Sequence, residues 1–133
     1  MSVVTNEQLS KMFQELSQKA RPLSEDPERA LAVIDQVEAE LAGNEVLHNA
    51  VEGIPVMASF ARDCVRKIYT EASEKSITAV FTAFLYLIEK EDAIKDSIPV
   101  IGYVDDLSIF AIAKEMAKED LERYRAWTRS PSR

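Results

Sequence analysis

The chain contains very little cysteine, histidine or glycine. Its 133 residues include one cysteine, Cys64, and one histidine, His48. A lone cysteine excludes an internal disulfide and a cysteine metal cluster. With three glycines in the whole chain, a turn-rich β architecture is disfavoured, because tight turns recruit glycine. These scarcities favour a helical protein that folds without disulfides.

Long apolar runs are also missing. The most apolar segment, residues 77–88, is shorter than the roughly 20 residues that a membrane-spanning helix needs. The first residues, Met-Ser-Val-Val-Thr-Asn-Glu, lack the basic start and apolar stretch of a signal peptide. We therefore expect a cytoplasmic protein that does not span a membrane.

Nucleophilic catalysis has few candidates in this sequence. Cys64 falls on the apolar face of its predicted helix, which indicates a buried structural thiol. His48 would have to serve any serine–histidine or cysteine–histidine pair, and its surroundings contain no nucleophile motif. There is no glycine-rich phosphate loop either. The sequence therefore favours a protein that is not an enzyme.

The net charge is −7 and is spread unevenly. Residues 1–53 and 89–113 are rich in acids, whereas bases outnumber acids in residues 114–133. An acidic chain lacks the broad basic footprint that nucleic-acid binding needs. We expect no nucleic-acid partner, and a basic protein partner or a cation suits this charge.

Hydrophobic residues make up 47% of the chain, and their helical spacing predicts an all-α bundle of about five to six helices. Asp26 followed by Pro27 predicts a capped helix start, and Ile54-Pro55 predicts another. The segment 77–88 is apolar on all sides, so we expect it to be the central helix. A long final helix is predicted over residues 105–127, with Asp105 as its N-cap. Residues 1–127 form one expected domain, and residues 128–133 an expected frayed tail.

The segment Ile98-Pro99-Val100-Ile101-Gly102-Tyr103-Val104-Asp105-Asp106-Leu107 is the most distinctive in the chain. With the preceding Tyr86-Leu87-Ile88, it resembles the YkvA-like family, domain of unknown function 1232, over residues 86–113. The resemblance implies a small bacterial helical domain, often described near membranes, with no agreed biochemical activity. Family motif positions agree at Ile98, Pro99, Gly102, Tyr103 and Leu107, which we interpret as structural.

Four aspartates fall on the family's acidic positions, namely Asp92, Asp96, Asp105 and Asp106. If the chain folds back as a helical hairpin there, these carboxylates converge, because residues four apart share a helical face. Their charges then call for Mg²⁺ or Ca²⁺, for helix N-terminal N–H groups, or for arginine and lysine partners. The plainer alternative is that they cap helices.

Three functions remain open from the sequence. The first is a non-enzymatic interaction or regulatory module, for example an immunity or antitoxin protein that binds a basic toxin. The second is a metal-dependent enzyme or sensor that uses the four aspartates. The third is a membrane-peripheral module, suggested by residues 98–113 and the basic C-terminal end.

Overall fold

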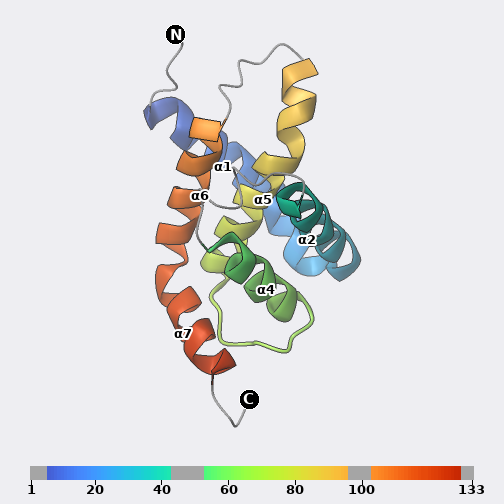
Figure 1. The fold of residues 1–133 in the computed structure, drawn as a ribbon, viewed down its shortest axis with the longest axis vertical. Helices are drawn as coiled ribbons and strands as arrows, with labels where there is room; N and C mark the ends of the chain where they lie inside the picture. Colours follow the sequence, from blue (N-terminus) through green and yellow to red (C-terminus); the bar gives the residue numbers. More distant parts are fainter. Residues whose placement is uncertain (1–5, 43–52, 96–102, 130–133) are drawn as a thin grey trace.

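A computed structural model describes the backbone of residues 6–42, 53–95 and 103–129, without the side chains at 6–10, 12, 24, 41, 89–95 and 103–108. Within these ranges the chain is helical and contains no strand (Figure 1). This confirms the predicted all-α fold. The elements are α1 (Asn6–Ala20), the 3₁₀ helix η1 (Arg21–Glu25), α2 (Pro27–Ala42), α4 (Ile54–Val65), α5 (Glu74–Lys95), α6 (Tyr103–Met116) and α7 (Lys118–Thr128).

Local capping chemistry sets two helix starts where the sequence predicts them. Asp26 Oδ1 accepts a hydrogen bond from the Arg29 N–H at 3.2 Å, and Pro27 is the first residue of α2. Gly53 precedes α4 with a φ of 105°, a conformation that side-chain-bearing residues rarely adopt. Residues 43–52, which include His48, lie outside the described residues.

Helix α5 is the centre of the fold and packs against α1, α2, α4 and α6. Every residue from Ala79 to Leu87 is buried, which confirms the central helix predicted over 77–88. Four phenylalanines within α5 and on the helices around it are fully buried: Phe60, Phe81, Phe84 and Phe110. Burial of each contributes about 1.5–3 kcal/mol to folding. The buried Thr82 hydroxyl lies 3.1 Å from Ser17 Oγ on α1, so the polar atom is satisfied.

Two predicted boundaries are wrong. The charged segment after residue 88 continues α5 to Lys95, because its residues are good helix formers with glutamate and lysine four apart at Glu91 and Lys95. Helix α6 begins at Tyr103, so Asp105 lies inside its first turn and is not the N-cap. An acid is favourable anywhere in a first turn, and its presence does not fix the boundary.

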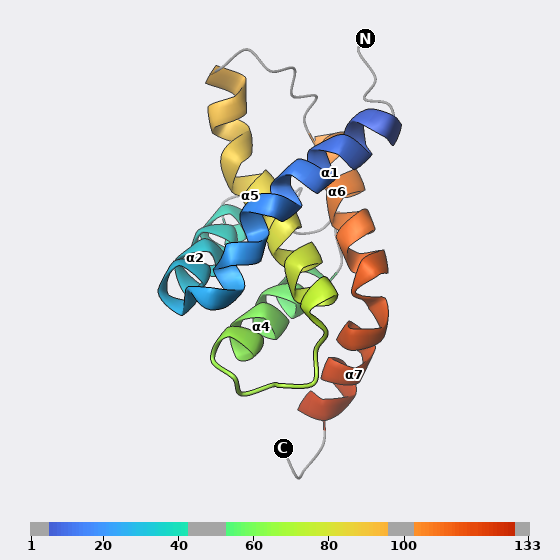
Figure 2. The same cartoon turned by 180° about the vertical axis from the view of Figure 1, so that it is seen from behind.

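The long helix predicted over 105–127 is divided at Ala117 into α6 and α7. The two parts pack on different neighbours: α6 lies against α5 and α1, whereas α7 lies against α4 (Figures 1 and 2). Backbone hydrogen bonds still cross the junction, from the Ala117 N–H to Ala113 O and from the Leu121 N–H to Ala117 O. The break at Ala117 therefore lets α6 pack against α5 and α1 while α7 packs against α4.

Candidate functional site

The aspartate cluster predicted from the sequence lies largely outside what the structure describes. Asp92 is a backbone position in α5, Asp105 and Asp106 are backbone positions in α6, and Asp96 falls between the described ranges. Their convergence stays a prediction, as does any Mg²⁺ or Ca²⁺ site there. Across residues 6–42, 53–95 and 103–129, no described group of three or more histidine, cysteine, aspartate or glutamate side chains could hold a metal ion.

Some of the family motif residues also lie outside the described residues. Tyr103 and Leu107 belong to α6, and Ile98, Pro99 and Gly102 fall outside the described residues. Their interpretation as structural residues stays a prediction.

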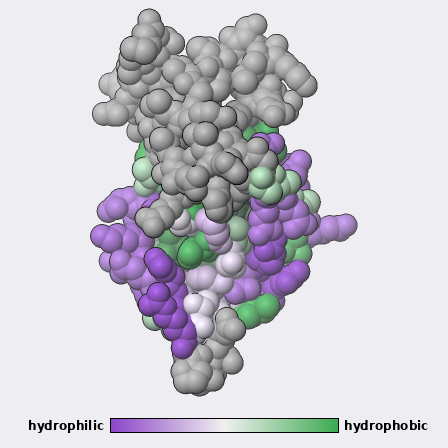
Figure 3. Space-filling view, viewed as in Figure 1, coloured by the Kyte–Doolittle hydropathy of each residue, from purple (hydrophilic) through white to green (hydrophobic). Residues whose placement is uncertain are grey.

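A surface groove runs between α4 and the α6–α7 arm, and we call it the α4–α7 groove. It consists of two adjoining hollows of about 700 Å³ and 420 Å³ that share Pro55, Val56 and Arg125. The α4 wall carries Gly53, Pro55, Val56 and Ser59. Hydrophilic side chains cover the left edge, where α6 and α7 run, and paler and hydrophobic surface lies beside them (Figure 3).

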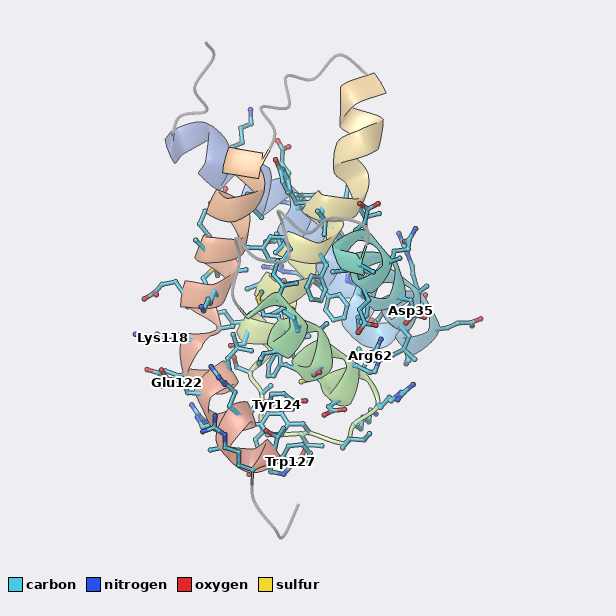
Figure 4. The ribbon with its side chains drawn as sticks, viewed as in Figure 1. Asp35, Arg62, Lys118, Glu122, Tyr124 and Trp127 are labelled. Carbon is cyan, nitrogen blue, oxygen red and sulfur yellow. The ribbon has the colours of Figure 1, made fainter. Side chains whose placement is uncertain are left out.

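Four basic residues follow one stripe of the opposite wall: Lys114, Lys118, Arg125 and Arg129. Their spacing of four, seven and four residues keeps them on one helical face. Glu115 and Glu122 are the acids of that wall. Lys118 and Glu122 project from α7 at the outer edge of the groove (Figure 4). Among the described residues, Lys118, Arg125 and Arg129 form no ion pair.

The base of the groove is apolar and rigid. Leu121 is buried and Val56 is half-buried. Behind them, the buried Tyr124 donates a hydrogen bond from its hydroxyl to Asp63 Oδ2 at 2.7 Å. Its ring lies 5.8 Å from Trp127 and 5.5 Å from Phe60. The contacts of Tyr124 with Asp63 and Phe60 hold α7 against α4, whereas the contact with Trp127 lies within α7.

The opposite face of α7 is held by a buried carboxylate. Asp120 is 6% exposed, and its Oδ2 accepts hydrogen bonds from Ser73 Oγ at 2.8 Å, Ser76 Oγ at 2.5 Å and the Ser73 N–H at 3.2 Å. Burial raises the pKa of Asp120, but the hydrogen bonds from Ser76 and Ser73 outweigh it and leave the pKa below its ordinary value. Asp120 therefore ties the start of α7 to the start of α5.

The far side of α4 is held by an ion pair. Arg62 donates from Nη1 to Glu38 Oε2 at 3.2 Å and from Nη2 to Asp35 Oδ1 at 3.1 Å, with Nη2 also on Glu38 Oε1. Arg62 points from α4 toward Asp35 (Figure 4). The hydrogen bond from Arg62 lowers the pKa of Glu38. The forked guanidinium thus links α4 to α2.

The lone cysteine does not contribute to the groove. Cys64 is half-buried, and burial, with the nearby carboxylates of Asp63 and Asp120, raises its pKa to about 12. The thiol is therefore protonated at neutral pH. It is half-buried, whereas the sequence predicted a buried thiol.

Sequence reasoning missed Asp120 and the groove, although each left a signal. Asp120 shares the buried face of its helix with Ala117, Leu121 and Tyr124 at helical spacing, which marks it as an acid that needs donors. Ser73 and Ser76 precede an apolar helix as capping residues do. The basic stripe could also be found from its helical spacing in the sequence. The sequence does not show that α4 lies opposite it.

Comparisons with known proteins add a family-level likeness. Residues 76–112 match the family model "Protein of unknown function (DUF1232)". The resemblance to the YkvA-like family is confirmed for this segment. The chain is also 25% identical over 77 residues to the "Uncharacterized membrane protein YkvA" of Bacillus subtilis (strain 168), covering 58% of this chain and 73% of that protein. No solved structure shows a significant match.

The matched segment comprises most of α5 and the greater part of α6, so it contains the central helix and leaves out α7. The α4–α7 groove therefore lies mostly beyond the family segment. None of the described helices is both long enough and apolar enough to cross a membrane.

Proposed function

We propose that this chain is a non-enzymatic interaction module that binds a protein partner in the α4–α7 groove. The observation that carries the proposal is the basic stripe of Lys114, Lys118, Arg125 and Arg129 beside an apolar floor. Three of these bases, Lys118, Arg125 and Arg129, form no ion pair with a described residue. Charged side chains of this kind beside a hollow are typical of a surface that recognises a partner.

The chemistry of the groove supports binding over catalysis. Within the described residues, no thiol and no imidazole lines it. The thiol of the chain lies elsewhere and has a raised pKa. Glu115 and Glu122 are exposed surface carboxylates, which lack the burial that tunes an acid–base pair.

The charge of the groove revises the expected partner. The sequence as a whole is acidic and suggests a basic partner, such as a toxin neutralised by an immunity protein. The hollowed surface, however, carries four bases and two acids, so complementarity favours an acidic segment at this site. A basic partner would have to use the acidic surface elsewhere, and we place it second.

A pull-down experiment with the wild-type chain and two variants as bait proteins tests the proposal. The wild-type chain, the variant Lys118→Glu/Arg125→Glu and a charge-matched control, Lys11→Glu/Arg29→Glu, are incubated with extract of the organism that encodes the chain. We expect at least one protein to be enriched by the wild type and the control and lost from the groove variant, as quantified by mass spectrometry.

A photo-crosslinking residue in place of Ser59, which is exposed on the α4 wall, places that protein in the groove. The same residue at Gln14 on α1 is the matched control. If no protein depends on the groove charges, or if both positions crosslink equally, the proposal is wrong.

A second candidate function, contact with a membrane surface, rests on Ile68. This side chain is 54% exposed, and the preceding residues Arg66 and Lys67 are exposed bases, a pattern found in residues that dip into anionic headgroups. The relative from Bacillus subtilis is named a membrane protein, which also supports this candidate function. Co-sedimentation with anionic vesicles at low salt, lost in Ile68→Asp, would support it, and the net charge of −7 opposes it.

A further inference from the structure

We infer that the α4–α7 groove takes an amphipathic α-helix with an acidic face, supplied by a protein partner. The inference rests on the function proposed above and names the chemistry of the occupant. Four features of the groove carry it: the backbone of its walls, the small residues on them, the spacing of its bases and the placement of its acids.

The walls are helical, so most of their backbone donors and acceptors are engaged within the helices. Residues Ile54–Val65 form one wall, and the stretch from Ala111 to Thr128 forms the other. The hydrogen bonds of α4 begin with the Met57 N–H to Gly53 O, so in this wall only the N–H groups of the first turn lack a helical partner. An extended strand in the groove would leave its own N–H and C=O groups unpaired on that side. A helix satisfies its backbone internally, and therefore fits walls of this kind.

Small residues lie on both walls of the groove. Ser59 belongs to the α4 wall, beside the larger Pro55 and Val56, and Ala111 belongs to the α6 wall. Gly53 is covered by the Lys114 side chain, which lies 3.7 Å from the position of a side-chain carbon there. Packed helices lie about 8–10 Å apart, and small residues at the contact favour the short end of that range.

The bases set the length and the pattern of the partner. Lys114 and Arg129 are fifteen residues apart, which corresponds to about 22 Å, or about four turns, of helix. Acids two turns apart on an occupant helix match the seven-residue spacing of Lys118 and Arg125. Apolar side chains between those acids rest on Leu121 and Val56.

The acids Glu115 and Glu122 select against other anions. A nucleic acid presents phosphate at every step, and some of these phosphates would meet the two glutamates. A flat anionic membrane cannot enter a concave groove. A helix can place a base or a neutral residue opposite each glutamate, and so satisfies the mixed pattern.

A designed peptide tests the inference. The probe is a helical peptide of about 18 residues, long enough for the groove at 1.5 Å per residue, with leucines on one face, glutamates beside them and alanine elsewhere. A second peptide has the same composition in an order that destroys the amphipathic face. Binding is measured by fluorescence anisotropy at low salt, against the wild-type chain, Lys118→Glu/Arg125→Glu and Lys11→Glu/Arg29→Glu.

We expect the amphipathic peptide to bind the wild type and the control alike, and the groove variant about tenfold more weakly. Lys118→Gln/Arg125→Gln, which adds no acid, should show a smaller loss in the same direction. Equal binding of the reordered peptide, or no binding of either peptide, overturns the inference.

The alternatives each have a distinct readout. Groove-dependent binding of anionic vesicles or of a single-stranded oligonucleotide, without the peptide, overturns the inference in favour of that ligand. Self-association of the wild type that is abolished in the groove variant, seen by sedimentation, makes the occupant a second copy and also overturns it. If the bait experiment finds a protein that depends on the groove but no peptide binds, the proposed function stands. The inference that the occupant is an amphipathic helix is then overturned.

Discussion

The two faces of α7 use charge in opposite ways. On one face, Asp120 is buried and accepts three hydrogen bonds from Ser73 and Ser76. On the other, Lys118 and Arg125 are exposed beside a hollow and form no ion pair among the described residues. A buried charge must be satisfied within the fold, whereas an exposed charge can be kept for a ligand. The comparison separates residues that hold α7 from residues that can recognise a partner.

The largest expected effect comes from the buried face. Asp120→Ala removes the acceptor of two hydroxyls and one N–H, and should lower the free energy of unfolding by about 2–3 kcal/mol. Urea denaturation followed by circular dichroism measures the loss. A change below about 1 kcal/mol would mean that water replaces the carboxylate at little cost, and the contrast between the two faces would fail.

The same carboxylate should make stability depend on pH. The folded-state pKa of Asp120 lies below its ordinary value, so the ionised group contributes stability that is fully present above the unfolded pKa of about 4. This contribution is lost as pH falls through the folded-state pKa. Urea midpoints between about pH 6 and pH 3 should fall less steeply for Asp120→Asn than for the wild type. Parallel curves would contradict the assignment.

A smaller effect on the free energy of unfolding distinguishes Arg62, which pairs with Glu38 and Asp35, from Arg125, which pairs with no described acid. Arg62→Gln breaks the fork to Glu38 and Asp35, and should cost about 1 kcal/mol, since the pair is partly exposed. Arg125→Gln should change the free energy of unfolding by less than about 0.3 kcal/mol. The two variants make a matched comparison in one urea series. Equal losses would show that Arg125 also supports the fold.

The smallest effect on stability is expected where binding is most affected. Lys118→Glu/Arg125→Glu should unfold within about 0.5 kcal/mol of the wild type, because neither base is used in the described contacts. Thermal melts and urea curves provide the measurement. A loss above about 1 kcal/mol would assign the basic stripe to folding, and the binding proposals would lose their support.

Several elements of the fold follow from local sequence alone. Asp26-Pro27 and Ile54-Pro55 mark two helix starts, because caps and proline act within a single turn. The apolar segment 77–88 is the buried centre, because a helix that is apolar on every side has no face to give to water. Phe81 and Phe84 of this segment are fully buried.

Other elements could not be predicted with the same certainty. The pattern of residues 105–127 is helical throughout, and nothing in it marks a bend at Ala117, which lacks the proline or glycine that usually produces one. Asp105 and Asp106 are equally good caps or first-turn residues. The convergence of the four aspartates depends on residues between α5 and α6 and stays a prediction.

The amino-acid sequence by itself determined that this protein is helical, which helix is central, and that bases outnumber acids near the C-terminus. Only the tertiary structure decided that α7 turns away from α6 to lie on α4, that Asp120 meets Ser73 and Ser76, and that the basic stripe borders a hollow. The reason is physical: periodicity and capping act over a few residues, so they give each helix its faces. Which faces meet depends on how all the helices bury their apolar surface together.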